Sequence, residues 1–226
     1  MPALMRLYED VLPGEAALRI VLPALPRMIF VVHGEAVIAG RSFRDGETWH
    51  GEGTAGLAPG SGGVTCWRFE LAPADAVDGA LAEGAARSRL KLAAAAETLP
   101  AGELLLRGDS VAFPPGGCAY LHRHQGPGIR CLIEGGIRID THGRSTSYGP
   151  GGAWYESGPD PVFAQAAPDR ATRFIRMMIL PRALIGKSSI EYLKPEDKER
   201  PKSQSYKGFA DLPISFPAQK HPCPRG

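Results

Sequence analysis

The sequence predicts an all-β protein built from two similar barrels or sandwiches. Glycine (28) and proline (21) recur between short apolar runs along the 226 residues, a spacing that favours many short strands. The segment from Ala74 to Leu92, with alternating alanines, leucines and charges, predicts a linker with a short helix. The apolar runs are rich in β-branched and aromatic residues: Met28 to Val32, Val64 to Leu71, Arg130 to Ile133, Ile137 to Ile139 and Thr172 to Leu180.

An internal repeat supports two barrels. Phe30 to Ile38 and Cys131 to Ile139 share an apolar run, a turn glycine and a following strand. Each half then ends with a strand of matching pattern, at residues 67–73 and 175–181. Such a unit used twice implies two similar folds. We therefore predict domains at residues 1–86 and 87–226, with a tail after residue 181 that wraps on the surface or adds an edge strand to the other half.

Composition and charge exclude several functions. The 26 basic and 24 acidic residues leave a net charge of only +2, which gives no electrostatic footprint for nucleic acid. No apolar run approaches the ~18 to 20 residues of a membrane span, and the acidic start does not fit a signal peptide. We expect a cytoplasmic protein with no nucleic-acid or membrane partner. The four cysteines lie far apart, which predicts reduced thiols.

Two histidines between Gly116 and Gly128 carry the chemical signal. His122 and His124 are separated by one residue, so on a strand both side chains leave the same face. Two imidazoles on one face form a natural pair of metal ligands. The alternative is a half-exposed strand with two incidental histidines.

This segment resembles the first motif of the cupin superfamily. That motif is a glycine, five residues, H-x-H, three or four residues, a glutamate, six residues and a glycine; Gly116, His122, His124 and Gly135 stand at those spacings. Pro150 to Tyr155 resembles the second motif, P-x-G-x-x-H, except at its last position. The resemblance implies two cupin-like double-stranded β-helix barrels, a bicupin, with the short helical linker between them.

Two departures change the implied ligand set. The family's glutamate would stand where this chain has Gly128, and its third histidine where it has Tyr155. Tyr155 is then a phenolate or hydrogen-bonding partner. Glu156 would point the other way on a regular strand, but a bulge could turn its carboxylate inward. A metal would therefore be held by His122, His124 and either Tyr155 or Glu156.

Strand alternation suggests two further residues in the pocket wall. Tyr120 is expected on the face of His122, and Arg130 two places beyond the vacated glutamate position, where it could bind a substrate carboxylate. The alternative for Arg130 is a rim position paired with a surface acid. For Arg176 and its repeat counterpart Arg68, a structural ion pair is the favoured interpretation.

The first half lacks the corresponding ligands. The repeat register places Val21 and Pro23 where the second half has its histidine pair. The sequence thus predicts a degenerate first cupin without a metal site.

The resulting functional hypothesis is a metal-dependent cupin enzyme acting on a small, oxygen-rich organic molecule. Iron(II) would support dioxygenase-like chemistry, whereas a redox-inert ion would serve isomerisation, elimination or hydrolysis; manganese, nickel and zinc are the other candidate ions. Tyr155 or Glu156, when not a ligand, is the candidate for proton transfer. The alternative is a non-catalytic module that binds a small ligand. Fold analogy adds a homodimer.

Overall fold

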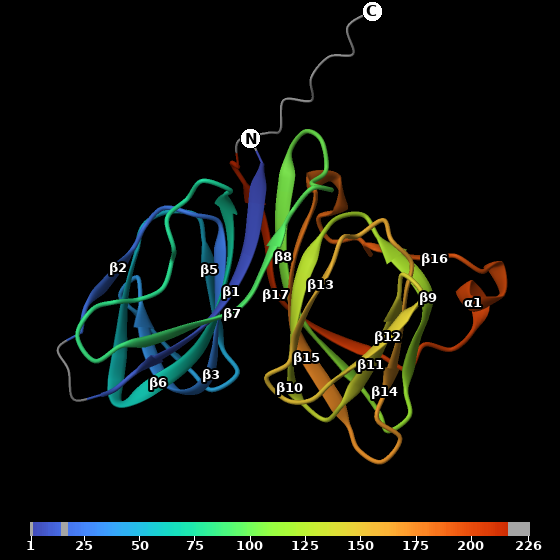
Figure 1. Ribbon diagram of the computed structural model, residues 1–226, viewed down its shortest axis with the longest axis horizontal. Helices are drawn as coiled ribbons and strands as arrows, with labels where there is room; N and C mark the ends of the chain where they lie inside the picture. Colours follow the sequence, from blue (N-terminus) through green and yellow to red (C-terminus); the bar gives the residue numbers. More distant parts are fainter. Residues whose placement is uncertain (1, 15–17, 217–226) are drawn as a thin grey trace, which may run out of the picture.

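The N-terminal strands form one antiparallel sheet. The computed structural model describes residues 2–14 and 18–216, and Figure 1 shows the N-terminal strands, blue to teal, gathered on one side. The sheet has the order β4 (Arg41–Arg44), β3 (Arg27–Ile38), β6 (Ala55–Pro73), β1 (Ala3–Leu12) and β7 (Arg87–Ala95), with β2 (Ile20–Leu22) paired to β6 and β5 (Thr48–Gly51) paired to β3.

The C-terminal strands form two five-stranded sheets. The first has the order β13 (Ala153–Glu156), β10 (Gly128–Glu134), β15 (Thr172–Pro181), β8 (Leu104–Phe113) and β17 (Ser205–Ile214). The second has the order β12 (Arg144–Tyr148), β11 (Ile137–Thr141), β14 (Val162–Ala166), β9 (Cys118–His124) and β16 (Ile190–Tyr192). Two short helices, η1 (Arg182–Leu184) and α1 (Pro195–Glu199), complete the described chain. Neither is long and apolar enough to span a membrane.

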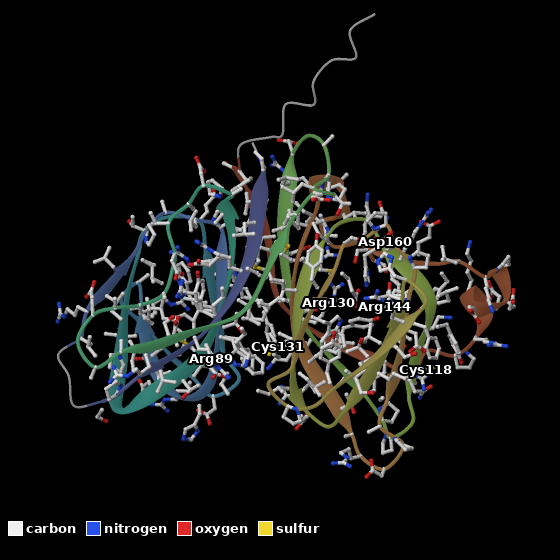
Figure 2. The ribbon with its side chains drawn as sticks, viewed as in Figure 1. Arg89, Cys118, Arg130, Cys131, Arg144 and Asp160 are labelled. Carbon is white, nitrogen blue, oxygen red and sulfur yellow. The ribbon has the colours of Figure 1, made fainter. Side chains whose placement is uncertain are left out.

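Period-two alternation lets β10 bury both of its faces. Ile129 and Cys131 point into a core shared with β1, β3 and β6 of the N-terminal sheet, whereas Arg130 and Leu132 point into the C-terminal part. Figure 2 shows Cys131 between the two halves and Arg130 on the C-terminal side. One core therefore joins the halves, and each half also has an apolar interior of its own.

The linker differs from the prediction. Residues 74–86 contain turns and no helix, and Arg87–Ala95 form β7, which pairs with β1. The predicted short helix is therefore absent. The alanines and leucines do not form an apolar stripe that a helix could bury, and as a strand along the free edge of β1 the segment satisfies its backbone groups. Residues 87–95, assigned to the second predicted domain, thus belong to the N-terminal sheet.

The chain after residue 181 contributes to the C-terminal half. β16 pairs with β9, and β17 pairs with β8, where it extends the first C-terminal sheet. Phe209 and Ile214 of β17 also pack into the core between the halves. The last ten residues of the predicted tail, 217–226, lie outside the described residues.

Candidate functional site

The two histidines of β9 lie buried inside the C-terminal part. His122 and His124 are each 4% exposed, and their ring centroids are 5.0 Å apart with the ring planes at 80°. His122 Nδ1 lies 2.6 Å from the backbone oxygen of Tyr120. That contact fixes the ring and leaves Nε2 as the proton-accepting nitrogen.

A bulge in β9 separates Tyr120 from this face. Val162 pairs with His122 and Ala164 with Ala119, so two residues of β14 span three of β9. The extra residue reverses the alternation. The structure therefore does not bring the Tyr120 side chain to the histidines; its ring lies under Arg200 and Lys202, 5.3 and 5.6 Å away.

Glu156 enters the cluster by regular alternation, without the predicted bulge. β10 and β13 pair in unbroken register, which sends Trp154 and Glu156 inward. Glu156 Oε1 accepts a hydrogen bond from Trp154 Nε1 at 2.8 Å. Its Oε2 lies 2.7 Å from Arg130 Nη2 and 3.8 Å from His124 Nε2.

Tyr155 lies on the opposite face of β13. Its ring packs against the core between the halves, and burial raises the pKa of its hydroxyl. The structure does not bring Tyr155 to the histidines, because the inward positions of this strand are the even-numbered ones. The inward-facing residue is thus Glu156, one position after Tyr155, where the second sequence motif would place its last histidine.

Arg130 fills the space next to the vacated glutamate position. A Cβ placed on Gly128 would lie 2.9 Å from Arg130 Nη1, and this nitrogen donates a 2.6 Å hydrogen bond to the Gly128 backbone oxygen. Arg130 is 1% exposed. A cation therefore stands where the cupin motif would place an anionic ligand.

A second buried ion pair borders His124. Arg176 Nε and Nη2 donate to the two oxygens of Asp109 at 2.9 and 2.7 Å. The remaining nitrogen, Nη1, lies 3.5 Å from His124 Nε2, and Ser189 Oγ lies 3.4 Å from His124 Nδ1. His124 thus has a cation at one ring nitrogen and a hydroxyl at the other.

The surroundings keep both imidazoles neutral. Burial lowers the pKa of His124 well below its usual value, and the charges of Arg176 and Arg130 lower it further. Burial also lowers the pKa of His122, against the attraction of Glu156. Burial lowers the pKa of Arg130 to about 10, so its guanidinium stays charged at neutral pH. Burial opposes the charged form of Arg176, but Asp109 raises its pKa.

The residues as arranged do not fit a divalent metal ion. Within residues 2–14 and 18–216, no three histidine, cysteine, aspartate or glutamate side chains are grouped to hold one. Both oxygens of Glu156 already face donors, and His124 Nε2 faces a guanidinium. The interior space beside His122 and Glu156 is about 20 Å³, which is room for about one water molecule. A divalent cation would add two charges beside the guanidiniums of Arg130 and Arg176.

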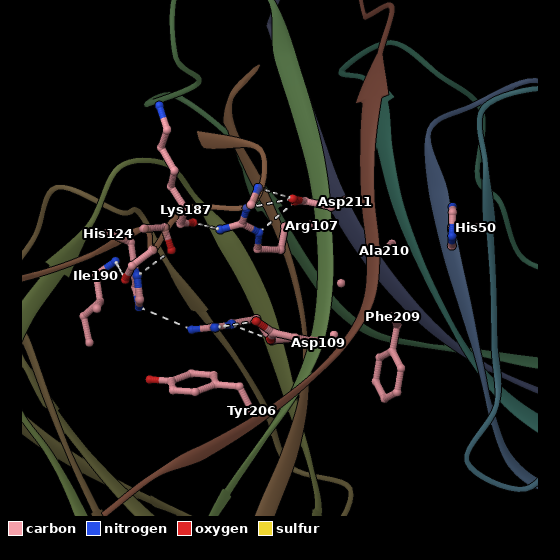
Figure 3. A pocket seen from close by; sticks show the side chains of 16 residues that line it. His50, Arg107, Asp109, His124, Lys187, Ile190, Tyr206, Phe209, Ala210 and Asp211 are labelled. Atoms are coloured by element: carbon pink, nitrogen blue, oxygen red, sulfur yellow. Dashed lines mark hydrogen bonds and ion pairs between the residues drawn. The ribbon is translucent and has the colours of Figure 1, made fainter. Parts of the chain in front are cut away.

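A larger cleft meets this cluster from outside. Its volume is about 650 Å³, and it lies between β8, β17 and residues 186–190. His124, Asp109, Arg176 and Tyr206 line its inner end, and His50 of the N-terminal sheet stands across β17 from them (Figure 3). The volume falls in the range of about 300–1,000 Å³ typical of small-molecule pockets.

Sequence reasoning missed three of these contributors. Asp109 lies within a largely apolar strand. Because an acid buried in a strand needs a charged partner, the sequence could have predicted an ion pair here. Ser189 and Tyr206 come from the tail, and no motif marks them. Only the pairing of β16 with β9 and β17 with β8 brings them to the histidines.

Solved structures share this fold. AerE from Microcystis aeruginosa has a TM-score of 0.55 at 13% identity, over 76% of this chain and 87% of that chain. The salicylate 1,2-dioxygenase from Pseudaminobacter salicylatoxidans has a TM-score of 0.51 at 13% identity, over 76% and 70%. At 13% identity, this likeness shows a shared fold.

Two further solved structures are also similar to this chain. A cupin 2 conserved barrel domain protein from Leptotrichia buccalis matches at a TM-score of 0.48 and 13% identity, over 79% of this chain and 84% of that one. A variant of the salicylate dioxygenase was solved in complex with gentisate; it has a TM-score of 0.51 at 14% identity, over 77% and 68%. No protein-family model and no curated protein matches this chain.

Proposed function

We propose that this protein binds a small aromatic carboxylate in the C-terminal cleft and transfers a proton on it without a metal. The observation that carries this proposal is the pairing of neutral His124 with Arg176 Nη1, the guanidinium nitrogen that Asp109 does not bind, at 3.5 Å, at the inner end of a cleft of about 650 Å³. Arg176 Nη1 is directed away from Asp109 and can donate to a ligand oxygen. The other two donor nitrogens of that guanidinium hold it in place.

The charges along the cleft favour a monoanion. Its charged lining residues are Arg107, Arg176, Lys187, Asp109 and Asp211, which leave one excess positive charge when the histidines are neutral. Because Arg107 pairs with Asp211 and Arg176 with Asp109, the excess charge is that of exposed Lys187, which attracts an anionic ligand.

The remaining lining favours a flat apolar body. Ile190 supplies apolar surface, and the Tyr206 ring lies 5.9 Å from the Arg176 guanidinium carbon, whereas Phe209 and Ala210 pack into the core between the halves. Aromatic walls with few polar groups are typical of small-molecule sites. A benzoate-sized acid with its carboxylate at Arg176 satisfies both the charge and the apolar lining.

The site residues support proton transfer of the isomerase or lyase type. His124 in its neutral form accepts a proton at Nε2, while Ser189 orients the ring through Nδ1. The adjacent guanidinium stabilises the negative charge that develops on a substrate oxygen. Glu156 and Arg130, behind the two imidazoles, hold each other and fix the rear wall.

A metal-dependent, dioxygenase-like enzyme is the second candidate. It is favoured by the adjacent imidazoles of His122 and His124 and by the Glu156 carboxylate 3.8 Å from the latter. This candidate requires Arg130 to release Glu156. Iron(II) would be the leading ion, with manganese, nickel or zinc as others, at one equivalent per chain.

Calorimetric titration separates the two candidates. Salicylate and gentisate are the probes, salicyl alcohol is the neutral control, and the protein is titrated after chelator treatment and again with one equivalent of iron(II). Binding of the acids but not of the alcohol to chelator-treated protein supports the proposal. Acid binding that appears only with iron favours the second candidate, and no binding in either form would refute the carboxylate site.

Two variants assign the residues. Arg176→Lys keeps the charge beside Asp109 but removes the donor next to His124, and should weaken salicylate binding about tenfold, the loss of one charge-assisted hydrogen bond. Arg173→Lys, on the same strand but paired with exposed Glu134, is the control and should bind normally. Equal affinity of the two variants would contradict the assignment.

The chain's organisation remains part of the proposal. We place two cupin barrels on either side of residues 96–103, supported by the buried arginine–aspartate pairs Arg68–Asp10 and Arg176–Asp109 in the two halves. The degenerate first cupin, the homodimer and the cytoplasmic location stay predictions.

A further inference from the structure

The small interior space beside the two histidines has polar walls with unused hydrogen-bonding capacity. Its volume is about 20 Å³, and its polar lining includes His122, His124, Arg130, Glu156 and Arg176. Arg130 and Glu156 line this space but not the outer cleft. Because a space of this size holds about one water-sized group, a single oxygen atom in it contacts the polar atoms of every wall.

Two guanidinium nitrogens offer hydrogen-bond donors to this space. Arg130 is 1% exposed, and its Nη2 has no hydrogen-bond acceptor among the described residues. Its 2.7 Å approach to Glu156 is an ion pair without hydrogen-bond geometry. Arg176 Nη1, which Asp109 does not bind, meets no acceptor in the described part of the chain other than His124 Nε2, at 3.5 Å. Since a buried donor without a good acceptor is costly, both nitrogens favour an acceptor atom in the space.

His122 offers an acceptor to the same space. Its Nδ1 faces the backbone oxygen of Tyr120 at 2.6 Å, so the proton of the neutral ring is on Nδ1 and the lone pair is on Nε2. Within residues 2–14 and 18–216, nothing donates a hydrogen bond to His122 Nε2. His122 lines the interior space and not the outer cleft. The space therefore presents two donors and one open acceptor.

A hydroxyl group has the hydrogen-bonding capacity that this set of atoms requires. Its oxygen accepts two hydrogen bonds and its proton is donated in a third. A carboxylate oxygen has no proton to give to His122, and an ammonium group has no lone pair to offer the guanidiniums. A water molecule has the same capacity as a hydroxyl, so it suits the space when no ligand is bound.

We propose that the interior space is a subsite for one hydroxyl group, and that the ligand of the C-terminal cleft is an aromatic acid with a hydroxyl substituent. The hydroxyl oxygen accepts hydrogen bonds from Arg130 Nη2 and Arg176 Nη1 and donates one to His122 Nε2, while the ring and the carboxylate stay in the cleft. This inference rests on the proposed function, because the cleft has to hold the rest of the ligand.

The partition between the cleft and the interior space controls access to the subsite. Four residues line both cavities and therefore stand between them: His124, Arg176, Ile190 and Tyr206. His124 and Arg176 are buried and bonded to neighbours. Tyr206 is 53% exposed, and its hydroxyl bonds to none of the described residues. The Tyr206 ring is thus the part of the partition that moves aside when a hydroxyl group enters.

Calorimetric titration of the full chain with matched benzoates tests the subsite. Each of the three hydroxybenzoate isomers is compared with the fluorobenzoate of the same substitution pattern, because fluorine is similar in size but has no proton to donate. At least one hydroxybenzoate should bind about fivefold tighter, or more, than its fluorinated counterpart, since a hydroxyl reproduces the hydrogen bonds of the water that it displaces. Smaller differences in all three pairs would overturn the subsite.

Benzoate itself reports on the cleft alone. If benzoate binds and the hydroxyl preference is missing, the subsite is wrong and the proposed function stands. If none of the acids binds, the carboxylate site is refuted, and the subsite that depends on it is refuted as well.

A variant of His122 assigns the acceptor. His122→Phe keeps an aromatic ring but removes Nε2, so the ratio of hydroxybenzoate to fluorobenzoate affinity should fall to within about twofold of one. The matched control is His33→Phe, at a histidine that is 84% exposed in the N-terminal half, and it should keep the ratio of the parent. A parental ratio in His122→Phe would refute the assignment. The comparison of hydroxyl with fluorine in the parent protein tests the subsite even if His122→Phe does not fold.

Discussion

The buried pair Arg176–Asp109 should be among the most sensitive interactions of the C-terminal half. Both side chains are nearly inaccessible, at 8% and 9% exposure, and Arg176 donates to both oxygens of Asp109, at 2.9 and 2.7 Å. Removal of one partner from such a pair costs about 3–5 kcal/mol, because the other charge stays buried without compensation. Asp109→Leu and Arg176→Met should each lower the free energy of unfolding by about 3 kcal/mol, and Tm by roughly 6–12 °C.

A double-mutant cycle by urea unfolding isolates the interaction. The double variant Asp109→Leu/Arg176→Met should lose much less than the two single losses added together, since no buried charge remains. The matched control is Arg123–Glu191, which has the same two-bond geometry at 2.9 and 3.1 Å but is 45% and 47% exposed. Its disruption should cost at most about 1 kcal/mol. Similar losses at both pairs would refute the claim that burial, and not geometry, sets the cost.

Three further predictions follow from single residues. His124 is neutral in the folded protein, since its pKa lies well below the usual value. Below about pH 6.5 this histidine is protonated in the unfolded chain but stays neutral in the folded protein. Stability should therefore fall between pH 6.5 and 5.5, by up to about 1 kcal/mol, more steeply than in His124→Gln; parallel urea curves would refute this. In a Cys223→Ser background, Cys118 should react with a thiol reagent at pH 8 well before Cys131, whose pKa burial raises to about 12; equal rates would contradict the packing. Gly34→Ala should cost more than about 1 kcal/mol in urea unfolding, since φ is +90° and the added Cβ would lie 2.3 Å from a backbone oxygen of β6; an unchanged midpoint would refute it.

The histidine pair of β9 shows how far spacing along one strand predicts a site. The interval between His122 and His124 fixes a common face, and the structure has both rings buried and 5.0 Å apart. The same parity argument misplaced Tyr120, because a bulge between Ala119 and His122 reverses the alternation. Bulges depend on the partner strand, so the sequence of β9 alone does not reveal one.

Motif alignment and strand register also diverged at the second motif. The motif placed Tyr155 at the third-ligand position, whereas pairing with β10 turns Glu156 inward. A shift of one residue exchanges the two faces of a strand. Which side chain faces the histidines was therefore decided by the pairing of β13 with β10.

By itself, the sequence determined the all-β class, the strand-rich halves and the inward histidine pair, because strand propensity and period-two spacing are local properties. Only the tertiary structure decided that β7 joins the first sheet, that Arg130 stands beside Gly128, and that the tail brings Ser189 and Tyr206 to the site. Those outcomes depend on which strand edges are free and on how buried charges find partners across distant segments. Both depend on the whole fold and not on neighbours in the chain.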